Sequence, residues 1–357
     1  MGPGGGDGQD DHRIEGQQLV KCYVIPSPQG IDSLKMVERP EPKPGPRQVL
    51  VRVRATSLNY RDLITIEGSY ARAAPKPDLI PLSDGAGEVV AVGPGVGRVK
   101  AGDRVAGCFM QRWFGGEFHP EAMTSAMGGA IDGMLTEFAV LEEDGVVKLP
   151  DHLSFEEGAT LPCAGVTAWN ALVEIGRIKA GDVVQIQGTG GVSIFALQFA
   201  RLFGARVIAT SSSSIKAERL RKMGAEAVID YKAIPDWDKE TTRLTSGRGA
   251  DIVVEVGGAG TLPRSFMAAR IGGTIPVIGL LTGLGATIDP MPMLRRNLRV
   301  QGLYVGSTQM FEAMTRAIAA AGLKPVIDKV FPFAEAREAY RHLKSQSHFG
   351  KVVISHS

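Results

Sequence analysis

The sequence predicts an α/β protein in which a doubly wound parallel sheet is joined to a β-rich, partly open barrel. Strands and helices alternate from about residue 151 to residue 307, which is typical of a parallel sheet with helical crossovers. Short strands separated by glycine and proline turns fill residues 17–150, as expected for a barrel. The segment "VVQIQGTGGVSIFALQFARLFGARVIATSSSSIKAERL", residues 183–220, reads as a strand, a glycine turn, an amphipathic helix and a second strand. That order is the one found in a Rossmann-type dinucleotide site.

Along the chain, the first predicted element is a disordered N-terminal segment, residues 1–16, because "MGPGGGDGQDDHRIEG" is rich in glycine and polar residues. Barrel strands are predicted in "QVLVRVRATSLN", "GAGEVVAVGPGV" and the following turn-bounded runs. A helix at 310–322 and a strand–helix–strand unit at 326–355 close the chain. The six strands predicted for the parallel sheet lie at 183–186, 205–211, 227–231, 251–258, 272–281 and 298–306.

Composition limits the partners and the environment that we expect. The 357 residues are enough for two domains, and 40 Lys and Arg against 38 Asp and Glu leave a net charge of +2. This balance argues against a nucleic-acid or anionic-membrane partner. No run approaches the roughly 20 apolar residues of a transmembrane helix, and the N-terminus has no apolar signal core. With three widely spaced cysteines and no disulfide framework, the sequence predicts a cytoplasmic protein.

The glycine turn after residue 187 predicts the site of a pyrophosphate. Gly188 and Gly190 allow a tight turn and a close approach of phosphate to the backbone, and Ser193 is the small residue that lets the helix pack on the strand. The alternative is an ordinary strand–turn–helix without a ligand. The predicted cofactor-binding turn consists of Gly188, Thr189, Gly190, Gly191 and Val192.

The end of the second strand predicts which dinucleotide binds. An NAD-preferring site usually has Asp or Glu there to accept hydrogen bonds from the ribose 2′-hydroxyl. Here four serines, residues 211–214, are followed by Lys216, and the first carboxylate is Glu218. Hydroxyls and an ammonium suit the 2′-phosphate, so the sequence predicts NADP(H). Lys216 could instead be a solvated charge at the start of a helix.

Motifs spread over the chain from about residue 19 resemble those of the medium-chain dehydrogenase/reductase superfamily, which includes zinc-type alcohol dehydrogenases and zinc-free quinone oxidoreductases. The motifs are "LNYRD" (58–62), "GAGEVVAVGPGV" (85–96), "GDRV" (102–105), "LPCAGVTAW" (161–169), "GTGGVS", "MGAEAVIDY" (223–231), "GADIVVEVGG" and "GKVVI".

The resemblance implies a discontinuous organisation. A GroES-like catalytic domain would comprise residues 17–150 and 308–357, a Rossmann domain would comprise 151–307, and the active site would lie between them. It also implies a homodimer or homotetramer, with the strand near 272–281 pairing with its twin.

The resemblance allows a prediction about zinc. Where the zinc enzymes have a cysteine, a histidine and, two residues on, an aspartate, this chain has Asn59, Tyr60 and Asp62. Where they have Gly-His-Glu, it has residues 82–84, Leu-Ser-Asp, and only Cys163 keeps a thiol. The lobe at 107–133, which should carry four cysteines for a structural zinc, has one. We therefore predict that the protein binds no metal.

Without a Lewis acid, oxidising a simple alcohol is difficult, whereas a quinone or an α,β-unsaturated carbonyl accepts hydride directly. The predicted function is therefore zinc-independent, NADPH-dependent reduction of such a small-molecule acceptor. An NADP-dependent alcohol/aldehyde oxidoreductase is the first alternative, and a cofactor-binding protein with vestigial activity is the second. Trp113, Phe114 and Phe118 in the lobe suit a flat acceptor, or they could simply pack the lobe against the barrel.

The residues predicted for chemistry occupy the positions of the lost zinc motifs. Asn59 could orient the substrate or the nicotinamide, and Tyr60 could donate a hydrogen bond or a proton or be a barrel-wall residue. Asp62 is expected to fix the loop, and Cys163 is either a packing residue or a reactive thiol. By family position, Ser83 and Thr167 would lie at the cleft, with Thr167 against the nicotinamide. Also by family position, the 2′-phosphate would be surrounded by Ser211, Ser212, Lys216 and Tyr231, and the nicotinamide side lined by Gly257, Gly279 and Leu280.

Overall fold

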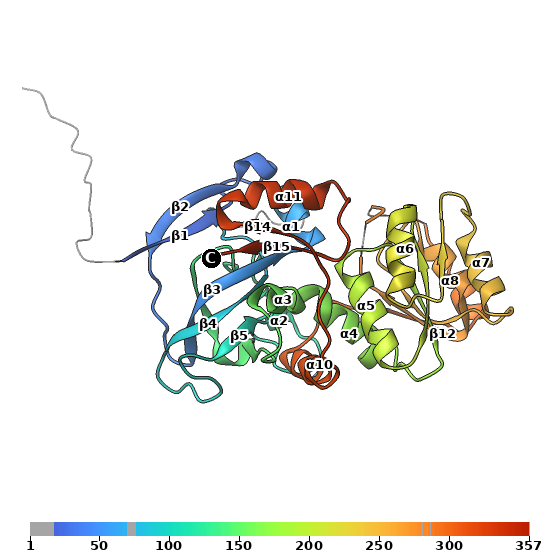
Figure 1. The fold of residues 1–357 in the computed structure, drawn as a ribbon, viewed down its shortest axis with the longest axis horizontal. Coiled ribbons are helices and arrows are strands. Elements are labelled where there is room, and N and C mark those ends of the chain that lie inside the picture. Colours follow the sequence, from blue (N-terminus) through green and yellow to red (C-terminus); the bar gives the residue numbers. More distant parts are fainter. Residues whose placement is uncertain (1–17, 70–75, 280, 284, 286, 357) are drawn as a thin grey trace, which may run out of the picture.

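The computed structural model describes residues 18–69, 76–279, 281–283, 285 and 287–356. The predicted N-terminal segment 1–16 and Leu280 therefore lie outside the described residues. Figure 1 shows two parts side by side, with the barrel strands at one end and the parallel sheet with its helices at the other.

The parallel sheet has the six strands that the sequence predicts, in the order β10-β9-β8-β11-β12-β13. All of its pairs are parallel, so the doubly wound α/β class is confirmed. The two strands at its centre, β8 and β11, are buried at every position because helices cover both faces. The strands are β8 (Val183–Gln187), β9 (Arg206–Thr210), β10 (Ala227–Ile229), β11 (Ala250–Val254), β12 (Ala269–Val277) and β13 (Arg299–Gly302). The helices are α5 (Gly191–Leu202), α6 (Ser214–Lys222), α7 (Trp237–Leu244), α8 (Leu262–Ala268) and α9 (Met291–Arg295).

The position of β12 bears on one expectation about assembly. β12 pairs with β11 on one side and, over residues 274–277, with β13 on the other. The strand predicted at 272–281 is therefore an inner strand of this sheet over residues 274–277, and its pairing with a twin stays a prediction. The edge of the described sheet on that side is β13.

The barrel part is a seven-stranded sheet that combines the two ends of the chain. Its order is β14-β15-β3-β4-β5-β7, and β6 also pairs with β3. The strands are β3 (Gln48–Leu58), β4 (Asp84–Val92), β5 (Arg104–Gly107), β6 (Phe138–Glu142), β7 (Val146–Lys148), β14 (Ile327–Pro332) and β15 (Lys351–Ser355), with β1 (Leu19–Val24) and β2 (Lys35–Pro40) as a separate pair. The helices on this side are α1 (Tyr60–Ile66), α2 (Pro120–Met123), α3 (Phe155–Ala159) and α11 (Ala336–Lys344).

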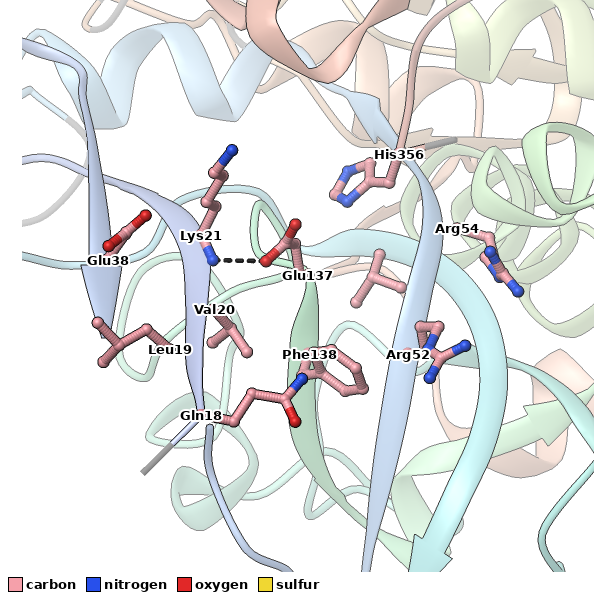
Figure 2. A pocket seen from close by; sticks show the side chains of 11 residues that line it. Gln18, Leu19, Val20, Lys21, Glu38, Arg52, Arg54, Glu137, Phe138 and His356 are labelled. Carbon is pink, nitrogen blue, oxygen red and sulfur yellow. Dashed lines mark hydrogen bonds between the residues drawn. The ribbon is translucent and has the colours of Figure 1, made fainter. Parts of the chain in front are cut away.

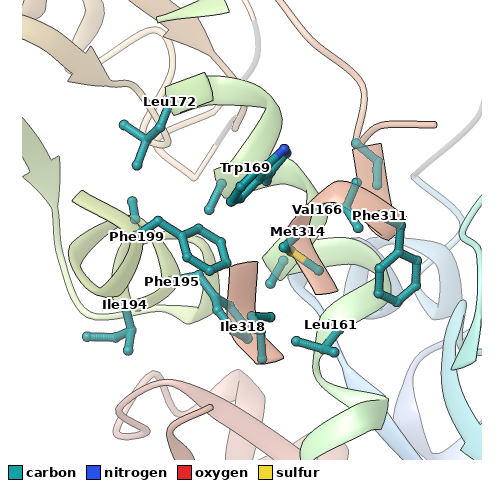
Figure 3. Packing of buried hydrophobic residues seen from close by; sticks show 14 of the residues in the cluster. Leu161, Val166, Trp169, Leu172, Ile194, Phe195, Phe199, Phe311, Met314 and Ile318 are labelled. Atoms are coloured by element: carbon teal, nitrogen blue, oxygen red, sulfur yellow. The ribbon is translucent and has the colours of Figure 1, made fainter. Parts of the chain in front are cut away.

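A helical segment at 161–175 lies between the two sheets. It consists of α4 (Val166–Trp169) flanked by two π-helical stretches, Leu161–Gly165 and Asn170–Ile175. Figure 3 shows its apolar face meeting α5 and α10 (Thr308–Ala321). Phe199 is fully buried there, with its ring centroid 5.6 Å from that of Trp169. This shared core joins residues from both parts of the chain.

Within the described residues, no helix is both long and apolar enough to cross a membrane.

Because Phe199 lies at the centre of this core, Phe199→Ala should lower the free energy of unfolding by about 3–5 kcal/mol, the usual range for truncating a buried phenylalanine. Chemical denaturation of the purified variant measures this change. Ile215→Ala, which truncates a side chain that is 74% exposed, is the control and should change stability by no more than about 0.5 kcal/mol. Equal losses in both variants would contradict the assignment of this core.

Candidate active site

The glycine turn is open where a phosphate would need room. Gly188 has φ 70°, in the left-handed region that favours glycine. A Cβ added at Gly188 or Gly190 would meet no atom within 4 Å, and α5 begins directly after Gly190. At Gly191 the situation differs, because an added Cβ would lie 2.7 Å from Cδ of Lys351. The turn thus leaves open space beside its backbone at the start of a 12-residue helix, which fits a pyrophosphate.

Hydrogen bonds within the protein hold the serine loop after β9 in place. Ser211 is buried and its N–H donates to Ile229 O, while the Ser213 hydroxyl accepts from the N–H of Lys216 and so caps α6. Lys216 Nζ donates to Gln346 O at 2.8 Å. Burial lowers the pKa of Lys216 from its ordinary value. The lysine is therefore not a fully solvated charge: it links α6 to the loop before β15.

A buried carboxylate, Glu255, organises the loop after β11, and no sequence pattern predicts this role. Glu255 Oε1 accepts from the N–H of Gly257 at 2.8 Å and from Thr261 Oγ1 at 2.5 Å. Its other oxygen accepts from Gln187 Nε2 at 2.8 Å and from the Ser265 hydroxyl. This network fixes the backbone of the loop that was predicted to line the nicotinamide.

The other residues predicted around the cofactor are placed as follows. Thr167 is buried within α4. Gly279 has no space for a side chain, because an added Cβ would lie 2.2 Å from Val256 O. Tyr231 is 42% exposed in the turn after β10, and Ser212 is half-buried.

At the end of β3, the chain enters α1 through Asn59. The N–H of Asn59 donates to Asp62 Oδ2 at 2.7 Å, so Asp62 holds the backbone where the chain enters the helix. Burial raises the pKa of Asp62 to about 6, although the Arg61 guanidinium nearby opposes the shift. Tyr60, the first residue of the helix, is 40% exposed, so it is not a residue of the barrel wall.

Ser83 and Asp84 lie side by side at the start of β4, and both are fully buried. Asp84 Oδ1 accepts from the Ser83 hydroxyl at 2.8 Å, and Oδ2 accepts from Ser57 Oγ and from the N–H of Cys163, both at 3.3 Å. Burial, with the negative charge of Asp84, raises the pKa of the Cys163 thiol. Cys163 is therefore poorly suited to act as a thiolate.

Lys351, the first residue of β15, joins these groups, and its side chain is only 3% exposed. Its Nζ donates to Leu58 O at 2.7 Å and to Asn59 Oδ1 at 2.5 Å, and it lies 3.5 Å from Asp84 Oδ2. Lys351 belongs to the motif "GKVVI", and no role is predicted for it from the sequence alone. Only the long-range pairing of β15 with β3 reveals its position.

The side chains around Lys351 do not form a set of ligands suitable for a zinc ion. Zinc requires three protein ligands from Cys, His, Asp or Glu, and no group of three such residues with a suitable arrangement occurs within the part of the chain that the structure describes. A cation would also have to compete with the Lys351 ammonium for Asn59 and Asp84.

Two hollows lie elsewhere on the molecule. One, of about 440 Å³, is on the barrel, where Figure 2 shows Lys21, Arg52 and Glu137 among its lining side chains. The other, of about 500 Å³, lies between the lobe and β13 and is lined in part by Trp113 and Phe118, whose ring centroids are 4.9 Å apart. Neither lining contains Asn59, Asp84 or Lys351, so packing of the lobe accounts for Trp113 and Phe118 better than contact with an acceptor at Asn59.

Two family models match the chain. One, described as the GroES-like domain of alcohol dehydrogenases, matches residues 45–151, and one described as zinc-binding dehydrogenase matches residues 191–320. A zinc-type alcohol dehydrogenase-like protein of Schizosaccharomyces pombe is 44% identical over 332 residues, which is 91% of this chain and 96% of that protein.

Solved structures show the same similarity. A putative alcohol dehydrogenase from Sinorhizobium meliloti has a TM-score of 0.87 and 41% identity, over 96% of this chain and all of that one. A mycobacterial protein solved in complex with NADPH has a TM-score of 0.79 and 25% identity, over 94% of this chain and 99% of that one.

Asp62 generates a prediction about the pH dependence of stability. A carboxyl whose pKa is higher in the folded than in the unfolded chain binds its proton more tightly when folded. Its contribution to the free energy of unfolding is therefore greatest below about pH 4 and is lost as the pH rises to about 6. Asp62→Asn, which keeps an oxygen for the N–H of Asn59, should become more stable relative to the native protein by up to about 3 kcal/mol between pH 4 and pH 7.

Denaturant unfolding at several pH values measures this difference. Ser83→Ala, which alters a buried neighbour but removes no titrating group, should retain the pH dependence of the native protein. A constant difference between Asp62→Asn and the native protein across this range would contradict the raised pKa.

Proposed function

The chain belongs to the medium-chain dehydrogenase/reductase superfamily and is an oxidoreductase, and we propose that it transfers hydride from NADPH to a quinone or an α,β-unsaturated carbonyl without a metal ion. The observation that carries this proposal is the Lys351 ammonium hydrogen-bonded to Asn59 and lying 3.5 Å from Asp84. In the zinc members of the family, the positions matching Asn59 and the segment around Asp84 supply metal ligands. Here the same positions surround a cation that belongs to the chain itself.

Support for NADP(H) comes from the loop after β9. Ser211 and Ser212 lie where an NAD-preferring site has a carboxylate, and Lys216 follows on the first turn of α6. The nicotinamide cofactor of this family, when bound, supplies the hydride. The open backbone at Gly188 and Gly190 is the part of the chain that would hold its pyrophosphate.

Support for an activated acceptor comes from the groups available to stabilise negative charge. Without a Lewis acid, an alcohol is difficult to deprotonate, whereas a conjugated carbonyl spreads the charge itself. Asn59 Nδ2 is buried and has no hydrogen-bond partner among the described residues. An N–H donor in this state suits the oxygen of the acceptor. Tyr60, which is partly exposed beside it in the chain, is the proposed proton donor.

The overall reaction would balance as quinone, NADPH and one proton giving quinol and NADP⁺. For an α,β-unsaturated carbonyl, hydride would add to the β-carbon, charge would move to the carbonyl oxygen, and a proton would then be taken up at the α-carbon. In both cases the acceptor gains two electrons. The names of the relatives favour the alternative, oxidation of alcohols or reduction of aldehydes, and the assay below separates the two.

The decisive experiment follows NADPH and NADH consumption with 9,10-phenanthrenequinone after exhaustive chelation. We expect NADPH-selective reduction that survives the chelator and is not increased by added zinc. Loss of activity on chelation with recovery on adding zinc, together with turnover of benzyl alcohol and NADP⁺, would instead establish the alcohol dehydrogenase. Tight NADPH binding without turnover of a broad acceptor panel would indicate vestigial catalysis.

Lys216→Ala tests the cofactor preference. Loss of the ammonium should raise the KM for NADPH at least tenfold, since a charge-assisted hydrogen bond contributes about 1.5–3 kcal/mol, and should change the KM for NADH less than twofold. Steady-state kinetics with each cofactor measures the two KM values and their ratio. Lys222→Ala, at the exposed C-terminal end of α6, is the control. Equal changes for the two cofactors would rule out contact between Lys216 and the 2′-phosphate.

A further inference from the structure

A carboxylate and an amide lie side by side at the carboxyl ends of the two central strands. Ile186 of β8 is opposite Val254 of β11 in the parallel register. The next residues, Gln187 and Glu255, are therefore neighbours at the same edge of the sheet, and both are buried. The strand order β10-β9-β8-β11-β12-β13 runs outward in both directions from this pair of strands. In open α/β sheets, ligands bind at such a switch point, beyond the carboxyl ends of the strands.

The contacts of Gln187 define the orientation of its amide. Its Oε1 accepts from the N–H groups of Val256 and Gly257, both at 3.2 Å, and because a backbone N–H only donates, this end must be the carbonyl. The NH₂ group then faces Glu255, and Nε2 donates to Oε2 at 2.8 Å. The main-chain oxygen of Gln187 accepts from the Ser193 hydroxyl of α5 at 2.7 Å. Gln187 therefore contacts both the helix after the glycine turn and the loop after β11.

The Glu255 carboxylate accepts hydrogen bonds from neutral groups on both of its oxygens. Oε1 accepts from the N–H groups of Gly257 and Gly258 and from the Thr261 hydroxyl, and Oε2 accepts from Gln187 Nε2 and the Ser265 hydroxyl. An ionised carboxyl only accepts, so it satisfies all of these donors at once. Such a network holds each member in one arrangement, because every donor has its acceptor.

A second loop is attached to the first. The N–H and the hydroxyl of Thr282, after β12, both donate to Gly257 O, at 2.8 and 2.9 Å. Gly257 itself has no space for a side chain, because an added Cβ would lie 2.2 Å from Thr261 Oγ1. The N–H of Gly279 donates to Glu255 O at 3.3 Å. Gly257 and Gly279, both predicted to line the nicotinamide, thus belong to loops that are anchored at Glu255.

We propose that Glu255 is the positioning residue for the nicotinamide half of the cofactor: with Gln187, it fixes both loops on that side relative to the turn that would hold the pyrophosphate. This inference rests on the proposed function only for the presence of a nicotinamide cofactor. Glu255 is fully buried and acts through the backbone of Gly257 and Gly258, without touching the cofactor. The adenosine half would bind at the loop after β9, on the other side of β8, and should not depend on Glu255.

Glu255→Gln removes the charge and keeps the size of the side chain. Whichever way the new amide turns, its NH₂ meets a donor, the N–H of Gly257 at one end or Gln187 Nε2 at the other, so the loops should shift. The Kd of NADPH should rise at least tenfold. The Kd of adenosine 2′,5′-bisphosphate, which has the 2′-phosphate but no nicotinamide, should change less than twofold. Calorimetry on the full chain measures both, and Glu226→Gln, which removes an exposed carboxylate paired with Arg206 at the amino end of β9, is the matched control.

An exchange of acid and amide tests the coupling between the two strands. In Gln187→Glu alone, two carboxylates would face each other, and the Kd of NADPH should again rise at least tenfold. In the double variant, Gln187→Glu with Glu255→Gln, the carboxylate lies on β8 and the amide on β11, and the donors of the network still have acceptors. The Kd of NADPH should then return to within threefold of the native value. Losses that add in the double variant would overturn the proposal, as would an unchanged Kd of NADPH in Glu255→Gln.

Hydrogen exchange tests the loop without any ligand. In ligand-free Glu255→Gln, the amides of residues 256–262 should exchange at least tenfold faster than in the native protein, while those of residues 206–210 keep the native rate. The double variant should restore slow exchange, and native rates over residues 256–262 in Glu255→Gln would overturn the proposal. If Glu255→Gln does not fold, Thr261→Val, which removes one donor to Oε1, replaces it and should raise the Kd of NADPH at least threefold with that of the bisphosphate unchanged.

These measurements do not depend on the acceptor. If binding and exchange change as expected but the native protein reduces no quinone or enone, only the proposed function fails. If the native protein binds NADH and not NADPH, then NADH and AMP replace NADPH and the bisphosphate, and the same ratios are expected. Equal weakening of the whole dinucleotide and its adenosine half in Glu255→Gln would overturn the proposal, because Glu255 would then support the site as a whole.

Discussion

The antiparallel pairing of β15 with β3 is the interaction on which the rest of this site depends. It joins the last strand of the chain to the first long strand of the barrel, with Val352 opposite Leu58 and Ser355 opposite Ala55. Immediately before β15, the N–H of Gly350 donates to Thr189 O in the glycine turn at 2.9 Å. Lys351 lies between these two attachments. Its ammonium is therefore brought to the end of β3 by backbone hydrogen bonds, which are insensitive to the rotamer of any one side chain.

Burying several charged groups together is costly in free energy. The three charged groups at this site, Asp62, Asp84 and Lys351, are stabilised by different numbers of contacts. Asp84 accepts three hydrogen bonds and has Lys351 nearby, and Lys351 has three oxygens around it. Asp62 accepts one backbone N–H and has a guanidinium 3.6 Å away. Burial raises the pKa of Asp62 to about 6. The charge of Asp62 therefore depends on pH in the range around pH 6.

The parts of the molecule that could be predicted from the sequence are those whose structure is determined by residues adjacent in the chain. The strands of the parallel sheet are short segments rich in Val, Ile and Ala, and the glycine turn joins one of them to an amphipathic helix, so both are visible locally. The contacts of Lys351 with Asn59 and of Lys216 with Gln346 join residues more than 100 positions apart, and no local pattern encodes them. Glu255 was missed because a lone glutamate after a buried strand resembles a surface residue until its donors are known. The inner position of β12 could not be predicted for the same reason, since a strand's own residues do not determine strand order.

The side chains around Asn59 limit the chemistry that we propose for this site. A metal ion can hold protein ligands and polarise a substrate oxygen at once, because it has coordination positions to spare. An ammonium has three donors, and at Lys351 two of them bond to Leu58 O and Asn59 Oδ1, while Asp84 Oδ2 lies 3.5 Å away. The Asn59 amide is neutral and stabilises a developing oxyanion less than a divalent cation does. Such a site suits acceptors that delocalise the incoming charge over a conjugated system, and this is the physical reason for proposing quinones and enones over simple alcohols.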